Sequence, residues 1–173
     1  MQVSGIELEE TSPGVFYTSS EFVTADDHMV AFLKRAANTS PTQRARLCAH
    51  PSPAAEQHDM LVVTTRDSYV APHRHLTKSE TFLVIEGQAD ALLFDDDGTL
   101  ASIVAMGPAQ TGRSFFYRMP HRRFHALRVL SDHVVFLESA KGPYDPDASE
   151  YAPWAPGPTE TDAGLRYISA CLA

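Results

Sequence analysis

The sequence has little cysteine and no long run of apolar residues. Cys48 and Cys171 are its two cysteines, which is too few to indicate a disulfide framework. No apolar stretch reaches the ~18 residues that a membrane span requires. The first ten residues, MQVSGIELEE, are acidic and do not have the basic start and apolar stretch of a signal peptide. We therefore expect a cytoplasmic protein without a membrane partner.

The chain also has little positive charge, and that charge is unevenly distributed. Its formal net charge is −8, which argues against nucleic acid as a partner because phosphate binding requires a basic face. Between Asp97 and Asp132 there is no acidic residue. This segment instead contains Arg113, Arg118, Arg122, Arg123 and Arg128. These arginines either pair with the acidic residues of the C-terminal tail (Asp145, Asp147, Glu150, Glu160 and Asp162) or line a pocket for a small anion.

We find no internal repeat, and the 173 residues are consistent with one domain of three parts. Residues 1–42 form an N-terminal extension with a helix at about 25–38, because apolar residues recur there at helical spacing. Thr24 is expected to cap this helix. Residues 141–173 form an extended C-terminal arm packed on the barrel, because the stretch GPYDPDASEYAPWAPGP is rich in proline.

Between these parts, residues 43–140 change to the period of two that is typical of β-strands. Many short strands are separated by turn signals, the clearest being Asp95-Asp-Asp-Gly98. Such a series indicates an all-β antiparallel sandwich or barrel rather than alternating strands and helices.

One group of residues in this region has the pattern of a metal site. His73 and His75 lie one residue apart, and alternate residues of a strand point to the same face. Glu80 is in phase with Phe82, which is expected to face inward, and a buried carboxylate is costly unless it is paired. His125 opens a later strand and is expected to approach from across the barrel. Three imidazoles and a carboxylate suit a divalent transition metal (Fe, Mn, Ni, Co, Cu or Zn) and leave coordination positions open for a substrate.

A second group of polar residues is a candidate for substrate binding. Arg44, Arg46 and His50 share one face of an expected strand, and the arginines could hold a carboxylate or phosphate if that face looks into the barrel. Lys78 lies in the turn between the proposed metal ligands. An outward polar face and an exposed turn lysine are the alternative interpretations. There is neither a nucleophile elbow nor a glycine-rich phosphate loop.

The segment PHRHLTKSETFLVIEG resembles the first motif of the cupin superfamily, with His73, His75, Glu80 and Gly87 at the motif positions. The second motif is matched by Pro120 and His125, although Arg122 stands where glycine is usual. RARLCAHPSP, the FDDDG hairpin and the Gly-Pro-Tyr-Asp-Pro tail are similar to the WbuC-type cupin-fold metalloproteins, which are found beside polysaccharide genes.

The resemblance implies a cupin double-stranded β-helix, a jelly-roll barrel, with His73, His75, Glu80 and His125 as metal ligands. The resemblance does not imply a particular reaction. The open coordination positions of the ligand set favour a metal-dependent enzyme of the isomerase, lyase or dioxygenase type. The substrate would be a small anion such as a sugar nucleotide or sugar acid. The alternatives are a metal-free sugar-nucleotide epimerase or isomerase, and a non-catalytic module that binds a small molecule or senses a metal. Because such barrels expose sheet edges, we also predict a homodimer.

Overall fold

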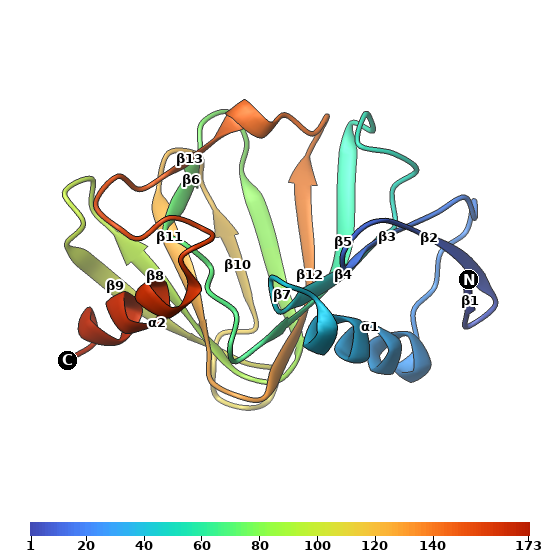
Figure 1. Cartoon of the computed structure of the whole chain (residues 1–173), viewed down its shortest axis with the longest axis horizontal. Coiled ribbons are helices and arrows are strands. Elements are labelled where there is room, and N and C mark those ends of the chain that lie inside the picture. Colours follow the sequence, from blue (N-terminus) through green and yellow to red (C-terminus); the bar gives the residue numbers. More distant parts are fainter.

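The computed structural model describes all residues from 1 to 173 and is built mainly of β-strands in two sheets (Figure 1). The barrel strands are β5 (Gln57–Thr65), β6 (His73–His75), β7 (Glu80–Glu86), β8 (Ala89–Phe94), β9 (Leu100–Met106), β10 (Phe116–Met119), β11 (Phe124–Val129) and β12 (His133–Lys141). They lie where the sequence predicts short strands, and the Asp95–Gly98 turn joins β8 to β9 with Gly98 at a φ of 90°.

The order of these strands defines the fold. In the larger sheet the barrel strands run β5-β12-β7-β10, and in the smaller sheet they run β6-β11-β8-β9. If the eight barrel strands are numbered from one in chain order, the larger sheet contains strands 1-8-3-6 and the smaller sheet strands 2-7-4-5. Each barrel pair is antiparallel. This is the jelly-roll arrangement, so the expectation of an all-β, cupin-type barrel is confirmed.

Four strands that precede β5 enlarge the larger sheet, three from the N-terminal extension and one from the segment predicted as the barrel. Strands β1 (Gln2–Val3), β2 (Ile6–Ser12), β3 (Val15–Thr18) and β4 (Arg44–Cys48) continue it beyond β5. Only the β3–β4 pair is parallel, because helix α1 (Asp27–Thr39) connects the two strands. The side-chain oxygen of Asp26, rather than that of Thr24, caps this helix by accepting the N–H of Met29.

The C-terminal arm is extended only in its first half. After the short 3₁₀ turn η1 (Pro146–Ala148), β13 (Ser149–Tyr151) pairs with β6 and joins the smaller sheet. The expectation that the arm is extended throughout is wrong, because Thr161–Ala170 forms helix α2. Gly164 weakens the helical signal of this segment. A Cβ there would lie 2.3 Å from the ring of Tyr69, so the close packing of α2 on the barrel requires glycine.

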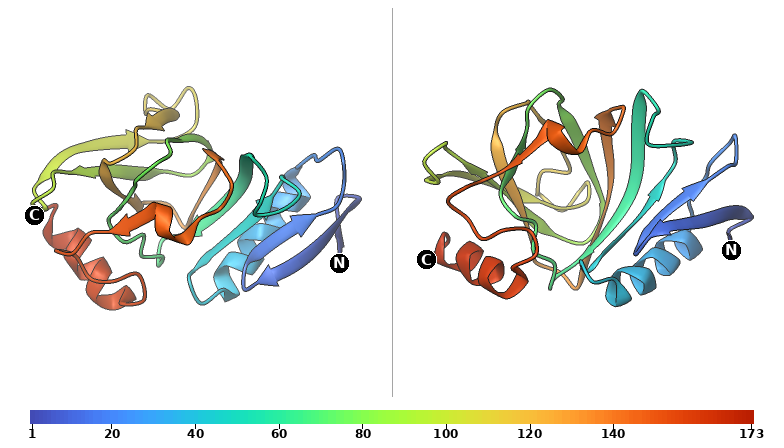
Figure 2. Two further views of the ribbon diagram at one scale, coloured as in Figure 1. Left: turned by 90° about the horizontal axis from the view of Figure 1, so that it is seen from above. Right: turned by 45° about the horizontal axis from the view of Figure 1, so that its top comes forward.

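The two helices lie at opposite flanks of the barrel, as do the two chain ends (Figure 2). Helix α1 buries Met29, Leu33 and Ala37 against one face of the larger sheet. Helix α2 buries Ile168 in a cluster with Tyr69 and residues of the smaller sheet. Neither helix is long and apolar enough to cross a membrane.

Candidate metal centre

The three predicted histidine ligands come from adjacent strands of the smaller sheet. His73 and His75 occupy the two ends of β6, and their rings point to the same face. His125 on β11 is the direct cross-strand partner of His73, and their ring centroids are 4.4 Å apart. His125 therefore approaches from the neighbouring strand, and the prediction that it comes from across the barrel is wrong.

Each of these rings is oriented through its Nδ1 atom. His73 Nδ1 lies 2.9 Å from the carbonyl oxygen of Ala71, and His125 Nδ1 lies 2.9 Å from that of Arg123. A carbonyl only accepts hydrogen bonds, so both Nδ1 atoms carry the proton and donate. His75 Nδ1 is 2.8 Å from the hydroxyl oxygen of Ser149 on β13. The Nε2 atom of each ring is thereby left as the metal-binding nitrogen, an arrangement typical of histidine ligands.

The carboxylate of Glu80 reaches this group from the opposite sheet. It begins β7 and is only 6% exposed. Its Oε2 is 3.0 Å from His75 Nε2, and its Oε1 is 3.2 Å from His125 Nε2. The hydroxyl of Tyr117 donates a hydrogen bond of 3.3 Å to Oε1. The carboxylate is therefore the member of the group that joins the two sheets.

Burial and mutual charge shift the pKa values of these side chains. Burial, and then the charge of neighbouring His125, lower the pKa of His73 to about 3, so its imidazole is neutral. Burial opposes ionisation of Glu80, yet His125 and His75 hold its pKa well below the usual range. Burial also opposes the charged form of His125, but the adjacent Glu80 raises its pKa. The centre therefore contains an ionised Glu80 carboxylate, a neutral His73 imidazole and a His125 imidazole whose pKa is raised.

These residues fit a divalent transition metal. The ligand nitrogens of the three histidines lie within 4.8 Å of one another. Two imidazole nitrogens bound to one ion at ~2.1 Å are separated by at most ~4.2 Å, so only a small contraction would be needed. His125 Nε2 is buried and directed at this point, where Glu80 Oε1 is 3.2 Å away but not in hydrogen-bonding geometry, so the nitrogen remains available to an ion. A set of three nitrogens and one oxygen suits iron, manganese, nickel, cobalt, copper or zinc.

The candidate centre opens into a cavity of about 590 Å³ between the sheets, a size within the range of small-molecule sites. The predicted ligands line it together with Tyr117 and Glu138. Glu138 was missed in the sequence, although it alternates in phase with Val134 and Phe136 of β12, as Glu80 does with Phe82. Its carboxyl lies in a cross-strand row between Met60 and Phe82.

These surroundings change the ionisation of Glu138. Burial, and then the negative charge of Glu80, raise its pKa to about 7. It forms neither an ion pair nor a hydrogen bond with another side chain. A carboxyl with this pKa can both accept and donate a proton near neutrality.

The structure separates the four predicted substrate-binding residues. Arg44 and Arg46 line the cavity. His50 lies beyond the end of β4, where it is buried and stacks on His58 with ring centroids 4.0 Å apart. Lys78 is half-buried in the loop between β6 and β7 and is not among the cavity-lining residues.

The arginines between Asp97 and Asp132 follow neither interpretation of the sequence. Arg123 pairs with Asp95 and Arg128 with Asp90, so both bind acids of the barrel rather than of the tail. None of the five arginines lines the cavity. The tail is attached instead by Arg74, which binds Glu150 at 2.8 Å.

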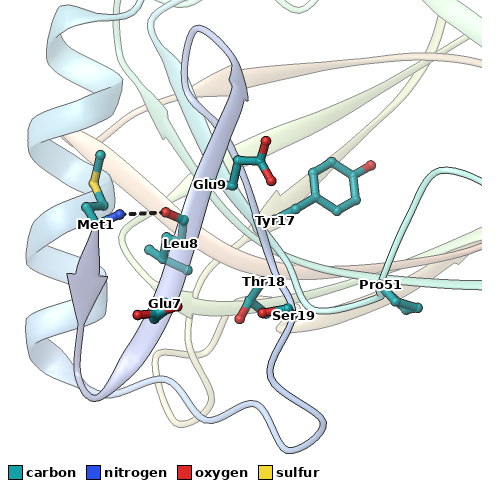
Figure 3. Close-up of a pocket in the computed structure, with 8 residues that line it drawn as sticks. All are labelled: Met1, Glu7, Leu8, Glu9, Tyr17, Thr18, Ser19 and Pro51. Atoms are coloured by element: carbon teal, nitrogen blue, oxygen red, sulfur yellow. Dashed lines mark hydrogen bonds between the residues drawn. The ribbon is translucent and has the colours of Figure 1, made fainter.

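A separate surface pocket of about 330 Å³ lies among the N-terminal strands (Figure 3). The side chains of Glu9 and Tyr17 border it, and the Met1 amine donates a hydrogen bond to the carbonyl of Leu8. This pocket contains none of the predicted site residues.

The comparisons with known proteins match part of the chain. A family model described as a domain of unknown function (DUF6016) matches residues 25–106. No curated protein matches the chain. Among solved structures, the chain is similar to the capsular polysaccharide assembling protein CapF from Staphylococcus aureus, with 17% identity and a TM-score of 0.46. That match covers 57% of this chain and 27% of CapF.

Two further structures show comparable similarity. KdgF from Halomonas sp. has 16% identity and a TM-score of 0.48, with 63% of this chain and 86% of KdgF covered. A mutant of Bacillus subtilis oxalate decarboxylase OxdC has 15% identity and a TM-score of 0.48, with 62% of this chain and 27% of OxdC covered. The chain thus spans about a quarter of the length of CapF and of OxdC. The strand order of the barrel itself shows the fold.

Proposed function

We propose that this protein is a metal-dependent enzyme of the cupin type that acts on a small anionic molecule, by isomerase- or lyase-type chemistry. The observation that carries the proposal is the convergence of three imidazole Nε2 atoms and the Glu80 carboxylate at the wall of a cavity. A structural metal site is normally closed, whereas this one faces space for a substrate. A divalent ion held there would polarise a substrate carbonyl or hydroxyl.

The chain's own residues supply the remaining functions. His73, His75 and His125 would hold the ion, with Ser149 and two backbone carbonyls keeping the rings in position. Glu138 would take a proton from the substrate and return it, since its carboxyl faces the cavity and its pKa is about 7. Tyr117 would hold the Glu80 carboxylate in place.

The proposal is tested by metal analysis of the purified protein beside the variants His75→Ala and His125→Ala. We expect the wild type to retain a transition metal through gel filtration, measured by inductively coupled plasma mass spectrometry, and both variants to lose it. His121→Ala is the matched control, because His121 is exposed in the loop before β11.

Circular dichroism spectra and melting curves would establish that the variants remain folded. Wild-type metal content in both folded variants would contradict the proposal. Turnover of a sugar-acid or sugar-nucleotide panel after complete metal removal would contradict it also, and would favour a metal-free epimerase.

The finer parts of the proposal are a WbuC-type identity, a role in polysaccharide biosynthesis and a homodimeric state. The dimer is tested by light scattering, where we expect twice the chain mass of 19.0 kDa. A mass of one chain would contradict it.

A further inference from the structure

The cavity has a second polar end that the metal centre does not use. Arg46 lies on β4 in one cross-strand row with Val62, Phe136 and Val84, whose side chains face the barrel interior. Residues paired across a sheet point to the same face. Arg44, two residues earlier on the strand, therefore shares that face, and both arginines line the cavity.

These two guanidinium groups form no ion pair within the chain, although the Glu138 carboxyl lines the same cavity and its charge acts on both. Arg66, Arg74, Arg123 and Arg128 each form an ion pair with a carboxylate, but Arg44 and Arg46 form none. Arg44 is half-buried, whereas Arg46 reaches solvent. Burial, and then the neighbouring charge of Arg46, lower the pKa of Arg44, while Tyr151 and Glu138 oppose this shift.

We propose that Arg44 and Arg46 form an anion-binding subsite that holds the carboxylate or phosphate of the molecule whose other end faces the metal centre. This inference rests on the proposed function only in identifying the occupant of the cavity as a substrate. A guanidinium presents a planar fork of donors that matches two oxygens of a carboxylate or phosphate. An anion there would neutralise the two charges without displacing any ion pair of the fold.

The separation of the two ends restricts the shape of the substrate. Arg46 on β4 is separated from β7, the strand of Glu80, by β5 and β12. The residue of β7 that lies in the same cross-strand row as Arg46 is Val84, four residues after Glu80. This corresponds to roughly 20 Å between the Cα atoms along the sheet. Even with long side chains, one carboxylate or phosphate cannot bridge this span. The substrate is thus an elongated molecule with an anionic group at one end and an oxygen that can bind a metal at the other.

The test measures anion binding in protein freed of metal with a chelator. Inorganic phosphate is titrated by isothermal calorimetry into the wild type, the double variant Arg44→Gln/Arg46→Gln, and Arg35→Gln. Arg35 is an exposed arginine of α1 outside any ion pair, so its variant is the matched control for the loss of charge. We expect phosphate binding to weaken at least about tenfold in the double variant, because charge-assisted hydrogen bonds are lost, and to be unchanged in Arg35→Gln.

A second arm uses 6-phosphogluconate, which carries a phosphate at one end and a metal-chelating hydroxy acid at the other. In metal-loaded wild type we expect it to bind more tightly than phosphate. The double variant should lose affinity for both probes, while His75→Ala should lose only the advantage of 6-phosphogluconate.

The two proposals fail in distinguishable ways. Equal phosphate binding by wild type and double variant, or no phosphate binding by wild type, would overturn the anion subsite whatever the metal content. Loss of phosphate binding in the double variant of a protein that never retains metal would uphold the subsite and overturn the metal centre. Metal content and melting temperature of the double variant should equal those of the wild type.

Discussion

The two faces of the larger sheet use the same strands for different purposes. On the face covered by α1, strands β4, β5 and β12 present Leu47, Leu61, Val63 and Val135, which belong to an apolar cluster. On the cavity face, neighbouring positions of the same strands present arginines, a carboxyl and Thr64 among apolar residues. The packing face is thus apolar where α1 covers it, and the cavity face is mixed.

The difference shows how a barrel separates stability from chemistry. Successive residues of a strand point to opposite faces, so a charged residue can follow an apolar one without entering its core. On the cavity face, a ligand can offset the cost of polar groups that lack a partner within the chain, such as Arg44 and Arg46. Substitutions on the packing face should therefore change stability, whereas those on the cavity face should change binding or pH dependence.

The largest expected effect is that of Leu33→Ala on the packing face. Leu33 is fully buried between α1 and the sheet, so its truncation should reduce the free energy of unfolding by about 2–5 kcal/mol. Leu83→Ala is the matched control, because Leu83 is 37% exposed on β7, and it should cost about 1 kcal/mol or less. Urea denaturation measures both. A loss of metal from folded Leu33→Ala protein would contradict the conclusion that the packing face affects stability and the cavity face affects binding.

The next effect concerns pH and Glu138 on the cavity face. Because folding raises its pKa from 4.5 to about 7, folding favours the protonated form. Glu138 makes its full contribution to stability when the pH is below its pKa in the unfolded chain. This contribution is lost as the pH rises through its pKa in the folded protein. Between pH 5 and pH 8, metal-free wild type should lose up to about 3 kcal/mol relative to Glu138→Gln. If the free energies of unfolding in urea changed equally with pH in the two proteins across this range, the raised pKa of Glu138 would be contradicted.

The smallest effect is that of Ser149→Ala at the metal centre. Its hydroxyl lies 2.8 Å from His75 Nδ1, and removing such a support typically weakens metal binding about 10–100-fold. Competition with a chromophoric chelator measures the affinity. Ser149→Thr, which keeps the hydroxyl, should remain near wild type, and Ser102→Ala on the exposed part of β9 is the control. An unchanged affinity in Ser149→Ala would show that β13 does not support the centre.

Much of the site followed from strand periodicity. The spacing of His73 and His75 predicted a shared face, and Glu80 in phase with Phe82 predicted an inward carboxylate, which the structure shows. Glu138, which was not predicted, follows the same alternation with Val134 and Phe136 of β12. Arg122 stands where the cupin motif has glycine. Its φ of 65° shows that the backbone of the turn before β11 is still left-handed at this position.

Other features could not be predicted because they depend on long-range pairing. The glycine in α2 weakens a local helical signal and is explained only by the ring of Tyr69 against which it packs. The position of His125 on the strand beside β6 can be known only from the strand order. Periodicity predicts which face a residue points to, but not which strands are neighbours. The separation of His50 from Arg44 and Arg46 arose because β4 ends at Cys48.

The amino-acid sequence by itself determined that this protein is a barrel of short strands and which residue types face inward, because side-chain direction in a strand is a local property with a period of two. Only the tertiary structure decided that three histidines of one sheet meet a glutamate of the other, and that two arginines of an added strand face the same cavity. Those relations depend on which strands become neighbours, and burial over the whole chain sets that choice.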